Sequence, residues 1–102
     1  MRVPYRIFAT IRLEIEFTDG SKHTANIKFS QHATDHYCEL FERDAEQWTP
    51  DDMRYCWETM SAPHSCPFQD DEGWTYIPSQ IRRYRIDNVT IDEVYRVGRK
   101  AA

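Results

Sequence analysis

The sequence has few of the residues that build specialised loops and cross-linked scaffolds. It contains three glycines and three cysteines among 102 residues. The glycines lie far apart, which excludes a glycine-rich loop of the kind that cradles phosphate groups. An odd number of cysteines cannot all pair within one chain. We therefore expect reduced thiols and a cytoplasmic protein.

Long apolar runs are also missing. No stretch approaches the roughly 18–20 apolar residues that a membrane-spanning helix requires, and the first residues lack the apolar core of a secretory signal. With 40% hydrophobic and 14% aromatic residues, the chain has enough apolar material for one modest core. We expect a single domain over residues 1–102 and no association with membranes.

Charge is distributed unevenly along the chain. The formal net charge is −4, but residues 35–72 contain eleven acids and two arginines, a balance of −9. Residues 1–34 carry +2 and residues 73–102 carry +3. Segregated charge affects partners and association rates rather than the fold. The acidic middle therefore either packs against the basic flanks or meets a basic partner.

An alternating pattern at the start predicts a β-hairpin. Apolar residues occupy every second position from Val3 to Phe17, and a second alternating run covers residues 22–29. Both apolar rows share one face only if residues 18–20 form a three-residue turn, whose last residue is a glycine suited to the left-handed region. Phe8 interrupts the polar face and marks either a bulge or a covered position. The expected cross-strand pairs are Phe17–Ser21, Ile15–His23, Leu13–Ala25 and Ile11–Ile27.

The period becomes helical in the acidic middle. Apolar residues between Tyr37 and Trp48 recur at helical spacing, which predicts an amphipathic helix that begins near Thr34 or Asp35. Asp44 falls on the apolar face of that helix. Either the helix ends before Asp44 or the carboxylate has a partner such as an arginine.

A second helix is predicted directly afterwards. Thr49 is a suitable cap, Pro50 suits the first helical position, and two acids follow in the first turn. The same spacing argument makes Cys56 a small core residue rather than a reactive thiol. The expected apolar stripe consists of Met53, Cys56, Trp57 and Met60.

The last third is predicted to return to strands. Residues 61–73 contain two prolines and no periodicity, which indicates a long loop. Short strands are expected at 74–77 and 81–86, and residues 89–97 fit a final strand better than a short helix capped at Thr90. The fold class is therefore α+β: an antiparallel sheet of about four to five strands, built from an N-terminal hairpin and C-terminal strands, with two helices packed on one face.

The acids of the two expected helices form the clearest candidate binding surface. In the first helix they recur on one stripe opposite the apolar face. Side chains three or four residues apart on a helix lie about 5–6 Å apart, which suits a row of lysines and arginines on a partner. The candidate partner-binding residues are Asp35, Glu39, Glu42, Glu46, Asp51 and Asp52.

These patterns favour a binding protein over an enzyme, because the usual catalytic motifs are missing. A small acidic domain is typical of inhibitor, immunity and anti-defence proteins, including anti-CRISPR proteins, whose carboxylates cover a basic, nucleic-acid-binding surface of another protein. We expect no cofactor and no direct contact with nucleic acid. A homodimer stays open as an alternative, because open sheets have unpaired edges.

Two further alternatives depend on other residues. A zinc-stabilised module has suitable ligand types but lacks the short Cys-x2–4-Cys spacing that marks such sites. Its candidate ligands are His36, Cys38, His64 and Cys66. A nucleic-acid-binding domain would use the basic C-terminal segment, although the chain as a whole is acidic. Its candidate residues are Arg82, Arg83, Arg85 and Arg96.

Overall fold

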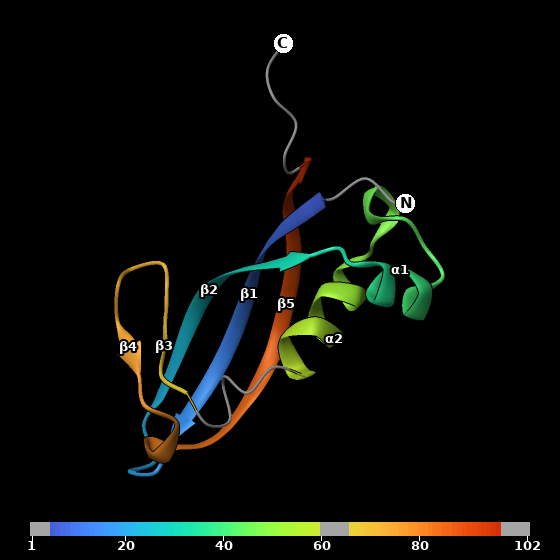
Figure 1. The fold of residues 1–102 in the computed structure, drawn as a ribbon. Coiled ribbons are helices and arrows are strands. Elements are labelled where there is room, and N and C mark those ends of the chain that lie inside the picture. Colours follow the sequence, from blue (N-terminus) through green and yellow to red (C-terminus); the bar gives the residue numbers. More distant parts are fainter. Residues whose placement is uncertain (1–4, 60–65, 97–102) are drawn as a thin grey trace.

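The computed structural model describes residues 5–59 and 66–96, which form an α+β fold. Three long strands make an antiparallel sheet in the order β2-β1-β5, and two short strands, β3 and β4, pair separately (Figure 1). The α+β class is confirmed, but the strands divide between two sheets instead of forming one sheet of four to five. The elements are β1 (Tyr5–Phe17), β2 (Lys22–His32), α1 (Asp35–Phe41), the 3-10 turn η1 (Ala45–Gln47), α2 (Pro50–Thr59), β3 (Phe68–Gln69), β4 (Thr75–Tyr76), the 3-10 turn η2 (Pro78–Gln80) and β5 (Ile81–Arg96).

The hairpin of β1 and β2 has the predicted register. Ile11 pairs with Ile27 and Ile15 pairs with His23, so the apolar rows share one face. Gly20 adopts a φ of +89°, in the region that a residue with a Cβ avoids. The three-residue turn is therefore confirmed.

The strand β5 is longer and less regular than expected. Its 16 residues form one strand, so the separate strands predicted at 81–86 and 89–97 are a single element, and the alternative helix at Thr90 does not form. Its ladder with β1 shifts register at three places, each of which leaves one extra residue on β5. These bulges disturb the alternation of apolar and polar residues, so the sequence pattern divides into two separate runs. One shift lies between Phe8 and Ala9, so of the two alternatives for Phe8, a bulge or a covered position, the bulge is observed. The extra residues are Arg82, Asp87 and Asp92.

The first helix is shorter than predicted. It starts after Thr34, whose hydroxyl accepts from the Tyr37 N–H, but it ends at Phe41 instead of continuing to Trp48. Glu42 has a φ of 58°, and the Arg43 N–H reaches back to the Cys38 carbonyl at 3.1 Å. This is a left-handed helix end of the kind usually made by glycine. Of the two alternatives for Asp44, the helix ending before it is the one observed.

The second helix starts as predicted. Pro50 is its first residue, and the Thr49 hydroxyl accepts from the Asp52 N–H at 3.3 Å. Met53, Cys56 and Trp57 are buried, while Met60 lies outside the described residues. The predicted apolar stripe is confirmed over its described part.

The core lies between the inward rows of the sheet and the apolar residues of the helical segment. Helix α2 contacts all three strands of the larger sheet, and the placement of both helices on one face stays a prediction. The region expected to be a loop at 61–73 contains β3, which pairs with β4, and residues 61–65 lie outside the described ranges. The β3–β4 turn joins the edge of β2, because the Asp71 N–H donates to the Asn26 carbonyl at 2.8 Å.

Candidate functional site

The acidic residues singled out in the sequence fall on three different elements. Asp35 and Glu39 lie one turn apart on α1, and Glu42 directly follows that helix. Glu46 lies in η1, and Asp51 lies in the first turn of α2. All five side chains are exposed. They do not form the predicted single helical stripe, because the chain leaves the helix at Glu42. They lie instead along the segment that Figure 1 shows beside the start of β1, and the Tyr5 hydroxyl there donates to Glu46 at 2.5 Å.

The sixth acid, Asp52, has a different environment. Its side chain is buried and accepts from Arg43 through Nε at 2.9 Å and Nη2 at 2.7 Å, and from the Thr49 N–H at 2.8 Å. Burial raises the pKa of Asp52, but the hydrogen bonds from Arg43 and Thr49 outweigh it and hold the pKa below its ordinary value. Asp52 thus joins the end of α1 to the start of α2, and we leave it out of the candidate surface.

The helical segment, residues 35–59, contains many more acids than bases. Residues 35–59 contain eight acids and two arginines. Both arginines are engaged locally, Arg43 by the buried Asp52 and Arg54 by Glu58 at 2.6 Å. Two of the candidate acids, Glu39 and Glu42, make no ion pair with any described residue. The segment therefore presents an excess of negative charge.

Five cations of the sheet, in contrast, pair with acids of the sheet. Arg85 pairs with Glu14, and Arg12 lies 3.5 Å from Asp87. The remaining pairs are Lys28–Asp92, Arg82–Glu16 and Arg83–Glu16. The fourth candidate nucleic-acid contact, Arg96, is exposed at the end of β5. These pairs join residues of β1, β2 and β5.

The zinc alternative gains no support from the described residues. Cys38 is buried with its thiol toward the Ala33 carbonyl at 3.9 Å, while His36 is exposed and packs edge-on against Tyr37. Cys66 is exposed, and His64 lies outside the described ranges. Within residues 5–59 and 66–96, no three His, Cys, Asp or Glu side chains lie close enough together to hold a metal ion.

Two features of the β3–β4 turn were not predicted. The Asp70 carboxylate is buried and accepts from the Glu72 and Trp74 N–H groups at 3.0 and 2.9 Å and from the Tyr76 hydroxyl at 2.7 Å. Burial raises the pKa of Tyr76, and the hydrogen bond from its hydroxyl to Asp70 raises that pKa further. An aspartate that precedes a glycine turn by three residues was the available signal. The turn presents Trp74 with 66% of its surface exposed.

Comparison of the chain with protein-family models, with curated proteins and with solved structures gives no match. None of the helices in the described ranges combines the length and the apolar character needed to cross a membrane.

Proposed function

We propose that this protein is a small cytoplasmic binding module, without enzymatic activity, that attaches to a basic surface of another protein. The contact is made by the exposed acids of the helical segment. They are Asp35, Glu39, Glu42, Glu46 and Asp51. Inhibitors of the anti-defence, anti-CRISPR or immunity type, which cover a nucleic-acid-binding groove, are the class that this chemistry fits best.

The observation that carries the proposal is the difference in charge compensation between the two parts of the chain. Five cations of the sheet pair with carboxylates of the sheet, whereas Glu39 and Glu42 make no ion pair with any described residue. A cluster of exposed like charges costs folding energy through self-repulsion, and it speeds encounter with a surface of the opposite sign. The chain as a whole is acidic, with a net charge of −4, which favours this interpretation over direct binding of nucleic acid.

A capture experiment with two matched double variants tests the proposal. The tagged full chain is incubated with nuclease-treated lysate of the native host and of its phage or competitor targets, and bound proteins are identified by mass spectrometry at low and moderate salt. The test variant is Glu39→Lys with Glu42→Lys. The control is Asp71→Lys with Glu72→Lys, which makes the same change in net charge on the exposed β3–β4 turn.

We expect one protein with a basic groove to bind the wild type and the control and to be lost with the test variant. Higher salt should release it, because exposed charges are screened beyond about 8–10 Å at physiological ionic strength. Retention of that protein by the test variant would contradict the proposal. So would recovery of this chain alone, which would indicate a homo-oligomer.

A further inference from the structure

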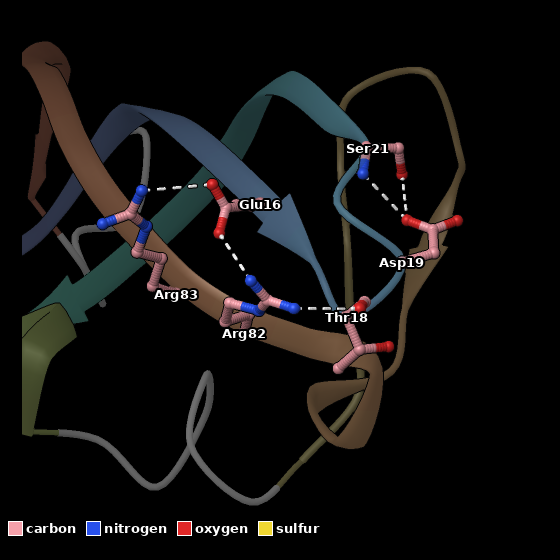
Figure 2. A network of polar contacts seen from close by, with 6 residues as sticks. All are labelled: Glu16, Thr18, Asp19, Ser21, Arg82 and Arg83. Atoms are coloured by element: carbon pink, nitrogen blue, oxygen red, sulfur yellow. Dashed lines mark hydrogen bonds and ion pairs between the residues drawn. The ribbon is translucent and has the colours of Figure 1, made fainter.

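A bulge in β5 directs two arginines onto one carboxylate. In the ladder with β1, Glu16 pairs with Arg83 and Phe17 pairs with Ile81, so Arg82 is an extra residue. A bulge bends its strand and re-aims the side chains beside it. The Nη1 atom of Arg82 lies 3.8 Å from one carboxylate oxygen of Glu16, and Nη2 of Arg83 lies 3.1 Å from the other (Figure 2).

A third cation flanks Glu16 on the opposite side. Lys22 is the neighbour of Glu16 on β2, as Arg83 is on β5. Lys22 makes no ion pair with any described residue. One carboxylate therefore faces three cations, Lys22, Arg82 and Arg83, and this end of the sheet keeps an excess of positive charge. The other pairs of this face, such as Arg12 with Asp87, are balanced one to one.

The two arginines are exposed to solvent, whereas the carboxylate that pairs with them is largely buried. The side chains of Arg82 and Arg83 are 60% and 74% exposed, whereas that of Glu16 is 14% exposed. Nη2 of Arg82 also donates to the Thr18 carbonyl at 3.2 Å. Figure 2 shows the acid of the turn, Asp19, directed away from Glu16, where its carboxylate is held by the N–H and hydroxyl of Ser21 at 2.9 and 2.6 Å.

An open hollow of about 390 Å³ lies beside the Glu16 carboxylate. Its lining includes Lys22, Arg83 and Arg85 together with Glu14 and Glu16. Small-molecule sites have volumes of roughly 300–1,000 Å³. Guanidinium groups present paired N–H donors that match the oxygens of phosphate.

We infer that the hollow binds the phosphate group of a small phosphorylated molecule. Lys22 and Arg83, which line the hollow, donate to the phosphate oxygens. Glu16, which pairs with Arg82 and Arg83 in the free protein, competes with the phosphate for Arg83. The site lies at the hairpin end of the sheet, away from α1 (Figure 1), and it does not depend on the proposed protein partner.

Titration of the full chain with pyrophosphate at low ionic strength, followed by isothermal calorimetry, tests this inference with three variants. Arg83→Gln should weaken binding about tenfold or more, because it removes hydrogen bonds between charged groups. Glu16→Gln should strengthen binding about threefold to tenfold, because it removes a negative charge beside the phosphate. Arg12→Gln removes a cation from the same face of the sheet but outside the lining of the hollow. It should change the affinity by less than about twofold.

The opposite signs of the responses keep the test independent of folding, since a misfolded Glu16→Gln protein would not bind more tightly. Absence of saturable binding up to about 10 mM pyrophosphate would overturn the inference, and so would equal weakening in Arg12→Gln and Arg83→Gln. A single-stranded oligonucleotide serves as the comparison ligand. If it binds far more tightly than pyrophosphate and with a steep dependence on salt, the site recognises a nucleic-acid backbone and the assignment to a small ligand is wrong.

Discussion

Replacement of Asp52 by alanine should destabilise the fold more than the same replacement of any other acid in the helical segment, residues 35–59. The carboxylate accepts from Arg43 through two nitrogen atoms and from the Thr49 N–H, and its own N–H returns a hydrogen bond to the Thr49 hydroxyl. Its side chain is 5% exposed. The substitution therefore removes the partner of a guanidinium and part of the cap of α2 at the same time.

The magnitude follows from how far each partner is buried. Breaking a fully buried ion pair costs about 3–5 kcal/mol. The Arg43 side chain is 40% exposed, so water can solvate the guanidinium once the carboxylate is gone. We therefore expect Asp52→Ala to lower the free energy of unfolding by about 2–3 kcal/mol. For a domain of this size that corresponds to a fall in Tm of roughly 10–20 °C.

Urea unfolding followed by tryptophan fluorescence measures this loss, with Glu58→Ala as the control. Glu58 pairs with Arg54 on the same helix, but that pair is exposed and should contribute only about 0.3–0.5 kcal/mol. The reasoning fails if Asp52→Ala costs no more than Glu58→Ala.

The Asp52 effect should also depend on pH. The folded pKa of Asp52 is lowered relative to the unfolded chain, where an aspartate has a pKa of about 3.9. Its stabilisation is therefore complete above the unfolded pKa and is lost as the pH falls through the folded pKa. The difference in stability between wild type and Asp52→Ala should stay constant above about pH 5 and shrink below about pH 4.

Three further predictions concern other parts of the fold. Asp70→Ala leaves three donors without their acceptor, and urea unfolding should show a loss of about 2 kcal/mol; a loss below about 0.5 kcal/mol would contradict the role assigned to this carboxylate. Thiol labelling of the native protein at pH 8 should be fast at the exposed Cys66 and slow at the buried Cys38 and Cys56. Burial also raises the pKa of Cys56 to about 12. Rapid labelling of all three thiols would show that the core opens. Gly20→Ala should lower Tm by a few degrees through strain at φ +89°, and an unchanged Tm would mean that the turn can adopt another conformation.

The hairpin and the start of α2 could be predicted because local residues determine them. The alternation of β1 and β2 allows one register once Gly20 is placed in the turn, and that register is observed. Thr49 and Pro50 have side chains that suit one position in a helix, and they occupy it. In these places the backbone preference of a residue and the burial of its neighbours favour the same structure.

The end of α1, the length of β5 and the shape of the candidate surface could not be predicted. Glu42 adopts a left-handed conformation that glutamate seldom takes, so nothing in its neighbourhood indicates a helix end. The bulges at Arg82, Asp87 and Asp92 depend on pairing with β1, which is distant in the sequence. The buried Asp52 pairs with Arg43, which lies beyond the end of α1, so the pairing depends on where that helix ends.

The central claim is that the exposed acids of the helical segment meet a basic protein surface. The most direct test uses the partner that the capture experiment identifies. The association rate constant of this protein with that partner is measured by stopped flow as the ionic strength rises. We predict a steep fall with salt for the wild type and for Asp71→Lys with Glu72→Lys, and a slow, nearly salt-independent rate for Glu39→Lys with Glu42→Lys. Equal rates and equal salt dependence in all three proteins would contradict the claim.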